Sequence, residues 1–381
     1  MSTTTRVSNA NMMTFSEKLS RFSWVLFIPM CVVLSISLIV LFSAGGGSWT
    51  PFALSQFIKI IFGMLIFFFV SFSNIKTWIK SAYFIYAIAL ILIILVTFVG
   101  NVGMGAQRWL SIGGINIQPS EFIKIALVLA LARYFAWKNS VELTQFKNYL
   151  IPVLMLLLPF LLICAQPDLG TGISLGLITL GMFYIVGANK KWFVIAGILA
   201  LISAPIVWYG AMHDYQRNRI ITFVNPESDS RGAGYQINQA KIAFGSGGII
   251  GKGFLSGSQA QQSFLPEKHT DFIFTMLGEE FGFIGAFLLL MLYTFIVVVL
   301  FWCAKTCRNR FGQLVCFGFM LNFFIYYSIN ISMVLGLMPT VGVPLPLMSF
   351  GGSSLLSLLF GFGLCQNAHI HKDQQLSSKG F

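Results

Sequence analysis

The residues best suited to chemistry crowd into five positions of the chain: Glu267, Lys268, His269 and Asp271. A mostly apolar stretch follows them and runs to Trp302. A carboxylate at this place can accept a proton as a general base, and the neighbouring cations would hold it ionised. Asp is also a preferred N-cap residue, so Asp271 can equally begin a helix. The residue types leave both roles open.

A helix that begins at Asp271 would continue one face through Thr275, Gly278 and Gly282. The two glycines have the spacing of small residues that lets helices approach closely in a membrane. We therefore expect Asp271 to stand above a narrow slot between helices. Glu279 would lie about two turns deeper in the same helix.

A second pair of ionisable residues, Glu121 and Lys124, lies where the chain is otherwise apolar. Their i, i+3 spacing places both on one helical face. Glu suits a helix N-terminus, so the pair can be purely structural. Charged groups inside a span cost about 2.5–3.5 kcal/mol and usually face a bundle interior or a wet cavity. We expect this pair to line a cavity, a position that also suits a structural role.

Arg108 and Trp109 lie in GAQRWLSIGG, a loop flanked by glycines. An Arg and an aromatic ring at a membrane surface can be simple interfacial anchors. They can equally form one wall of a substrate groove, and the sequence does not decide between the two.

MPTVGVPLPLMSFGGSS, residues 338–354, contains three prolines and three glycines, which break helices. Non-helical backbone at membrane depth persists only where protein covers it or where it lines a water-filled cavity. We expect a re-entrant segment that floors the same cavity and contributes Ser349, Gly351 and Gly352. The alternative is a tight turn followed by a kinked last helix.

The composition identifies the kind of protein that must position these residues. The 381-residue chain is 56% hydrophobic and only 9% charged, with a mean hydropathy of +0.81. A soluble domain carries about 25% charged residues, so this chain is predicted to be an all-α polytopic membrane protein. The net charge of +12 comes from scattered residues, which indicates membrane orientation and no nucleic-acid partner.

Ten transmembrane helices are expected, between a tail at 1–23 and a tail at 368–381, with one membrane domain at 24–367. The expected spans lie near 24–43, 54–73, 81–100, 119–137, 149–165, 169–188, 192–210, 271–302, 312–338 and 344–367. Spans seven and eight are joined by a large extracytoplasmic loop, 210–271. If the N-terminus is cytoplasmic, fifteen of the 24 Lys and Arg fall inside, and Arg108 alone falls in the short outside loops. Both termini are therefore expected in the cytoplasm.

The large loop carries two further patterns. GYQINQAKIAFG predicts a short amphipathic helix whose apolar side chains lie on the outer leaflet: Ile237, Ala240, Ile242 and Phe244. GSGGIIGKGF is rich in glycine but lacks the G-x-x-x-x-G-K-[ST] spacing of a nucleotide-binding loop. A nucleotide site is therefore not expected.

Taken in order, these motifs resemble the SEDS family (shape, elongation, division and sporulation) over almost the whole chain. The matching stretches are GAQRWL, QPSEFIK, QPDLGTG, RNRI-TF-NPE-D--G-GYQ, LPEKHTDFIF with GEEFG, and MPTVGVPLPLMSFGGSS. GAQRW and GVPLPLMSFGG resemble the elongation branch, which is RodA-like, more than the division branch, which is FtsW-like. Phe350 stands where Tyr is commoner in the family.

The resemblance implies a peptidoglycan glycosyltransferase that polymerises lipid II, the undecaprenyl-pyrophosphate disaccharide peptide, for cell elongation and rod shape. It makes Asp271 the essential loop aspartate, matches Trp109 to a functionally sensitive tryptophan, and matches Glu121 and Lys124 to the family's charged pair in the fourth span. A divalent cation, Mg²⁺ or Mn²⁺, is implied by the family alone, with Asp271 as a possible ligand. The cations open to the pyrophosphate are Arg108, Lys124, Arg217 and Arg219.

The same resemblance implies the bacterial cytoplasmic (inner) membrane, with the active site facing outside. It also implies a class B penicillin-binding protein as the partner transpeptidase, together with elongation complex proteins. Three alternatives remain: a lipid II flippase, a septal FtsW-type polymerase, and a scaffold for the transpeptidase. A flippase needs a polar route through the bilayer, and Glu279 is the deepest residue that could belong to one.

Overall fold

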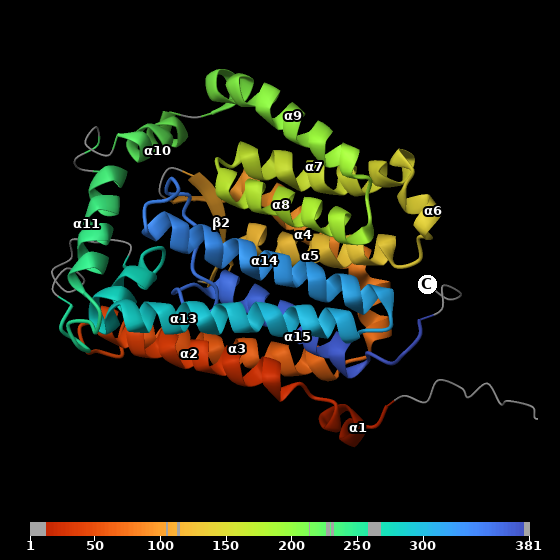
Figure 1. Ribbon diagram of the computed structural model, residues 1–381, viewed down its shortest axis with the longest axis horizontal. Coiled ribbons are helices and arrows are strands. Elements are labelled where there is room, and N and C mark those ends of the chain that lie inside the picture. Colours follow the sequence, from red (N-terminus) through yellow and green to blue (C-terminus); the bar gives the residue numbers. More distant parts are fainter. Residues whose placement is uncertain are drawn as a thin grey trace, which may run out of the picture.

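The computed structural model describes residues 13–103, 106–112, 115–212, 214–225, 229, 232–257 and 268–376. The long helices lie side by side along the longest axis of the molecule (Figure 1). Helices α10 and α11 and strand β2 lie at one end, here called the α11 end, and α1 and α6 lie at the other, the α1 end. The helices are α1 (Phe15–Ser20), α2 (Trp24–Ala44), α3 (Phe52–Phe72), α4 (Ile75–Val99), α5 (Pro119–Phe135), α6 (Ser140–Leu143), α7 (Leu150–Ala165), α8 (Leu169–Val186), α9 (Lys190–Ile206), α10 (Asp214–Val224), α11 (Ala233–Ser246), α13 (Ile273–Thr306), α14 (Arg310–Val334) and α15 (Gly352–Ile370).

The all-α membrane fold is confirmed, and each of the ten expected spans overlaps one long helix of the described chain. Within the part of the chain that the structure describes, eight segments are long and apolar enough to cross a membrane. Helices α5 and α15 are not among the eight, since α5 has only 17 residues and α15 carries polar side chains in its second half. A short 3₁₀-helix, Phe146–Tyr149, precedes α7, and a π-helical turn, Val207–Ala211, follows α9.

A small antiparallel sheet was not expected from the sequence. Its strands are β1 (Asn101–Gly103), β2 (Ala106–Ile112) and β3 (Ile115–Ile117), in the order β1-β2-β3. Arg108 and Trp109 therefore lie on a strand, where a loop was expected. The pairing of β2 with β1 shifts register at Arg108, because Gln107 and Trp109 pair with the consecutive residues Val102 and Asn101.

Helix α5 is the most enclosed element of the site region, because 14 of its 17 residues are buried. It packs against α4, α14 and α15. A helix buried on every side shows no apolar stripe, and its charged residues must find partners within the protein. Helix α9 is the opposite case, since none of its residues is buried.

The boundaries of the last two expected spans differ from those of helices α14 and α15. Residues 335–351 contain no helix or strand, and α15 begins at Gly352 where a span was expected from 344. The apolar side chains of this segment are at most 2% exposed at Val343, Leu345, Leu347 and Met348. The alternative of a kinked last helix is therefore wrong, and the irregular backbone at 343–348 is covered by protein, as expected, while Leu337 near the start of the segment is 68% exposed. The helix also runs past the expected boundary at 367 to Ile370.

The short helix expected in the large loop is present as α11, but it does not lie with its apolar face on a leaflet. Ile237 and Ala240 are buried, and the ring of Phe244 stacks on Phe274 of α13 at 5.6 Å. Ile242 is 53% exposed. The apolar face therefore packs mainly against α13.

Candidate active site

Asp271 lies at the α11 end, two residues before the first residue of α13. It is not the N-cap of that helix, because Phe272 occupies this position, so the capping interpretation is wrong. Its backbone carbonyl accepts a hydrogen bond of 2.9 Å from Nδ2 of Asn330 on α14. The same Nδ2 donates to the carbonyl of Val343 at 2.7 Å. One buried amide thus joins the aspartate to the irregular segment 335–351.

The backbone before Asp271 is fastened to that segment at two further points. Ser349 Oγ donates to the carbonyl of Thr270 at 2.6 Å and accepts from the N–H of Leu345 at 2.8 Å. The N–H of Phe350 donates to the carbonyl of His269 at 2.9 Å. The stretch 269–271 and the irregular segment 335–351 therefore form one hydrogen-bonded unit. Such a unit holds a functional side chain more rigidly than a free loop would.

Arg219 of α10 reaches the same place. Its Nη1 donates to the carbonyl of Thr340 at 2.8 Å. A Cβ placed on Gly342 would lie 3.8 Å from Arg219 Nη1 and 3.6 Å from Oδ2 of Asp271. Gly342 has φ +69°, a conformation that favours glycine. The glycine therefore lets a carboxylate and a guanidinium share one small space.

Of the other three members of the sequence cluster, Glu267 lies outside the described residues, and Lys268 and His269 lie just before Asp271. The imidazole of His269 stacks on Phe52 of α3, with ring centroids 4.3 Å apart, and approaches Phe350 at 5.7 Å. Burial lowers the pKa of Lys268 from its usual value near 10.5. Both residues lie outside the helices, within three positions of Asp271.

Glu121 and Lys124 form the expected buried pair near the start of α5. Lys124 Nζ donates to Glu121 Oε2 at 2.8 Å, and both side chains are almost fully buried. The ammonium also lies 3.5 Å from the ring centroid of Tyr326 on α14, a cation–π contact. Tyr326 and Asn330 are four residues apart on one face of α14. This face connects the buried pair to Asp271.

Arg108 has a partner that the sequence did not reveal. Its Nη1 lies 3.8 Å from Oδ1 of Asp168, and its Nη2 donates to the carbonyl of Pro167. Asp168 is the N-cap of α8 and accepts from the N–H of Thr171 at 3.4 Å. An Asp three residues before a Thr at a helix start is a capping signal that could have marked it.

The start of α8 also packs against the irregular segment. A Cβ on Gly170 would lie 3.0 Å from the carbonyl oxygen of Val341. Asp168, which anchors Arg108, is two residues away. The strand with Arg108, the pair on α5 and the backbone around Asp271 therefore surround one region at the α11 end.

Arg217 and Glu279 are not brought into this region. Arg217 Nε donates to the carbonyl of Trp208 at 2.8 Å, so this side chain fastens α10 to the turn after α9. Glu279 is fully buried and forms an ion pair of 2.7 Å with Lys252. It therefore serves to hold the large loop, and this pairing gives no support to the polar route that a flippase would need.

The slot expected below Asp271 is filled. Gly278 lies against the Phe244 ring and Gly247, and Gly282 lies against Gly251. The N–H of Phe283 donates to the carbonyl of Gly248 at 2.9 Å. Gly282 has φ +67° and kinks α13, which lets the loop backbone dock there. The glycines of GEEFG therefore admit a loop of the same chain, where a gap between helices was expected.

Ser349 lies beside the backbone just before Asp271, and Gly351 and Gly352 follow at the start of α15, next to Gln56 and Lys59 of α3. Gln56 of α3 holds this stretch, because its Nε2 donates to the carbonyl of Ser349 at 3.1 Å and its Oε1 accepts from Gly351 at 3.4 Å. No side chain caps α15 among the described residues.

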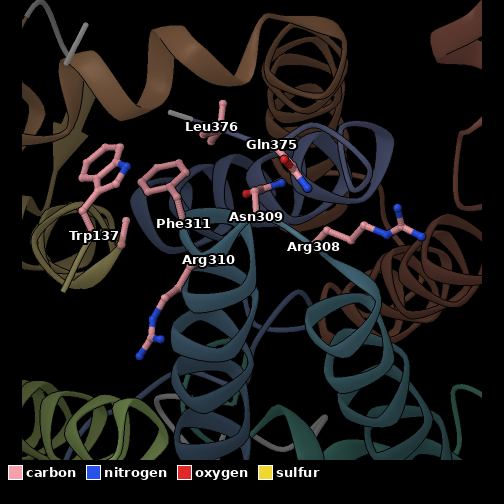
Figure 2. A pocket seen from close by; sticks show the side chains of 8 residues that line it. Trp137, Arg308, Asn309, Arg310, Phe311, Gln375 and Leu376 are labelled. Atoms are coloured by element: carbon pink, nitrogen blue, oxygen red, sulfur yellow. The ribbon is translucent and has the colours of Figure 1, made fainter. Parts of the chain in front are cut away.

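A separate cavity of about 280 Å³, whose lining does not include Asp271, is shown in Figure 2. It is lined by the turn between α13 and α14, the end of α5 and the residues after α15. The side chains of Arg308 and Arg310 extend from it in different directions, while Trp137 and Phe311 lie side by side (Figure 2). The cavity therefore does not gather its charges at one point.

Comparisons with known proteins show which family the chain matches. Residues 17–374 match the family FTSW_RODA_SPOVE, described as cell cycle proteins. Peptidoglycan glycosyltransferase MrdB of Escherichia coli (strain K12) is 45% identical over 289 residues, which cover 76% of this chain and 78% of that protein. A probable peptidoglycan glycosyltransferase FtsW of Trichlorobacter lovleyi is 38% identical over 296 residues, covering 77% and 76%.

Two solved structures resemble the fold. A chain of a peptidoglycan synthase complex, described in terms of coordinated polymerization and crosslinking, superposes with a TM-score of 0.81 at 28% identity. The match covers 93% of this chain and 99% of that one. Rod shape determining protein RodA of Thermus thermophilus superposes with a TM-score of 0.70 at 26% identity, covering 93% and 98%.

Proposed function

The chain belongs to the FTSW_RODA_SPOVE family and is a peptidoglycan glycosyltransferase, and we propose that it polymerises lipid II with Asp271 as the general base. The elongation branch is favoured over the division branch, since the MrdB relative is 45% identical and the FtsW relative 38%. The observation that carries the proposal is the fixed position of Asp271 beside Arg219 and the irregular segment.

The reaction joins the 4-hydroxyl of the acceptor GlcNAc to the anomeric carbon of the donor MurNAc. Undecaprenyl pyrophosphate leaves, and the α linkage becomes β. Inversion in a single displacement needs one base for the hydroxyl proton and positive charge for the leaving group. Asp271 supplies the base. Three hydrogen bonds to the backbone at residues 269–271 hold it while the sugars bind.

Among the four cations first considered for the pyrophosphate, Arg219 is supported best. Its Nη1 lies at Gly342 beside the Asp271 carboxylate. Lys124 is committed to Glu121, and Arg108 is held by Asp168 and Pro167. Arg217 is held on backbone carbonyls away from the site. We assign Lys124 and Arg108 the role of shaping the wall, and Arg219 that of meeting the charge that develops on the leaving group.

A divalent cation remains part of the proposal. Mg²⁺ is usually held by one or two carboxylates together with substrate phosphates, and Asp271 fits that arrangement. Among the described residues no group of three His, Cys, Asp or Glu could hold a metal alone. The cation would therefore be shared between Asp271 and the pyrophosphate. When bound, it would neutralise charge on the leaving group.

The flippase alternative is less well supported. A polar route would have to cross the middle of the bundle, where Phe319, Phe323 and Phe362 are at most 1% exposed. The ring of Phe362 lies 4.8 Å from Phe319 and 5.4 Å from Phe323. In the described chain the deep Glu279 already pairs with Lys252. These contacts favour an enzyme that works at one end of the bundle.

The protein is a multi-pass membrane protein. We assign the α11 end to the outer face of the bacterial inner membrane, which the distribution of Lys and Arg supports. The likeness to a chain of a peptidoglycan synthase complex supports a class B penicillin-binding protein as the transpeptidase partner, within a larger elongation complex. The scaffold role is compatible with catalysis.

Reconstitution separates the enzyme from the flippase. Purified protein and its partner are placed in vesicles with labelled lipid II, and penicillin blocks crosslinking. The proposal predicts glycan polymer on the side that carries the α11 end. Lipid II that crosses the membrane without forming polymer would contradict it.

A further inference from the structure

Lys59 is a cation inside a span that no role assigned so far requires. It is the eighth residue of α3 and is half-buried. Among the described residues no carboxylate lies within 4.0 Å of its Nζ. Lys124 and Glu279, by contrast, each have an ion-pair partner. An intramembrane charge without such a partner is costly and therefore indicates a ligand.

The surroundings of Lys59 belong to the catalytic end. Its Nζ lies 3.6 Å from the ring centroid of Phe350, whose N–H donates to the carbonyl of His269. Gln56, one helical turn away on α3, binds both Ser349 and Gly351. Lys59 thus contacts the hydrogen-bonded unit that holds Asp271, on the side of that unit that packs against α3.

The start of α15 lies against the methylene carbons of the Lys59 side chain. A Cβ on Gly352 would lie 3.8 Å from both Cδ and Cε of Lys59. The helix has 19 residues and lacks a side-chain cap, so its first N–H groups add partial positive charge beside the lysine. Two glycines keep this approach free of side chains. An anion fits here better than any other group.

The exposed face of α3 indicates what kind of molecule carries the anion. Apolar side chains that are at least 42% exposed continue along this helix toward the α1 end: Phe57, Ile58, Ile61, Phe62, Leu65 and Phe69. A hydrocarbon tail can lie along this face while its head group stays near Lys59. A polyprenyl diphosphate combines such a tail with a strong negative charge.

We propose that Lys59 binds the diphosphate of the polyprenyl-linked substrate, next to the N-terminus of α15. This inference rests on the proposed function, because it supplies a subsite for that substrate. Arg219 then meets charge at the Asp271 side of the irregular segment, and Lys59 holds a phosphate at the α3 side. The ammonium is a positioning group for the lipid and takes no proton in the reaction.

The test measures binding without turnover. The full-length protein carrying Lys59→Met is titrated with undecaprenyl pyrophosphate and with uncharged undecaprenol. We expect affinity for the pyrophosphate to fall about 10- to 100-fold, as for a lost hydrogen bond to a charged group, with undecaprenol unaffected. Lys59→Arg should restore most of the preference. Lys76→Gln, at an exposed lysine of α4, is the charge-matched control and should bind as the wild type does.

Steady-state kinetics with lipid II provide a second test. Lys59→Met should raise KM for lipid II by a similar factor while kcat changes less. Unchanged pyrophosphate affinity and unchanged KM in a folded Lys59→Met protein would overturn the inference. That outcome leaves the proposed function intact, because polymerisation that depends on Asp271 would continue.

Discussion

The carboxylate of Asp271 and the guanidinium of Arg219 meet at one glycine. A Cβ on Gly342 would lie 3.6 Å from Oδ2 of Asp271 and 3.8 Å from Nη1 of Arg219. The two residues are 52 positions apart and come from α10 and from the stretch before α13. The irregular segment 335–351 is therefore the element that assembles the site.

Gly342→Ala tests this relationship. Ordinary contacts surround the added methyl, but φ +69° strains an L residue by about 1–2 kcal/mol. We expect a lower melting temperature and reduced lipid II polymerisation, because the segment must shift near Asp271. Gly197→Ala on α9 is the control, since its methyl meets no atom within 4 Å and should leave both measurements unchanged. Full activity in Gly342→Ala would argue against the assembling role.

The buried pair Glu121 and Lys124 is predicted to be structural first. Removing either partner leaves a buried charge uncompensated, which typically costs about 3–5 kcal/mol. Glu121→Gln and Lys124→Met should each lower the melting temperature strongly. The double variant should lose much less than the sum of the two, as a double-mutant cycle of thermal unfolding would show. Additive losses would mean that the 2.8 Å contact carries little coupling.

Lys252→Ala is expected to loosen the large loop. It should not change the movement of lipid II across the membrane, because the Lys252–Glu279 pair is not part of a transport path. It removes the partner of the buried Glu279 carboxylate, while the backbone bonds from residues 252 and 253 to α13 remain. Hydrogen exchange at residues 247–253 should accelerate, and thermal stability should fall. Lys76→Gln again provides a surface control. If exchange at the loop stays at the wild-type rate, the ion pair does not hold it.

Lys268 predicts a pH dependence of stability. Burial lowers its folded pKa below 10.5, so the unfolded chain binds more protons between the two values. Stability of the wild type should therefore rise with pH in that window, relative to Lys268→Met, which has no proton to lose. Melting curves from neutral pH to about 10.5 measure the difference. A wild type that loses stability relative to the variant over this range would contradict the burial assignment.

The sequence predicted the helices well because apolar length alone identifies a membrane span. It also predicted the pair on α5 from its i, i+3 spacing, and the irregular segment from its prolines and glycines. These signals are local. A helix start is less well defined, so Asp271 was placed on α13 although the helix begins at Ile273.

Contacts between distant segments could not be predicted in this way. The glycines of GEEFG indicated a close approach but not its partner, which is the loop after α11. Asp168 was overlooked because its role depends on Arg108, 60 positions earlier, on a strand that the sequence did not reveal. Lys59 falls within an expected span, but its neighbours Phe350 and Gly352 come from the far end of the chain, so the sequence does not indicate what surrounds it.

Asp271→Asn is the most direct test of the central claim. The variant keeps the size of the side chain and removes the base, and general-base catalysis contributes typically 10²–10⁴-fold. The measurement is the rate of glycan polymerisation from labelled lipid II by the purified protein with its partner under penicillin. Thermal melting and co-purification of the partner show that the variant is folded. The account predicts a loss of at least about 10²-fold. A folded, partner-bound Asp271→Asn protein that polymerises at the wild-type rate would contradict it.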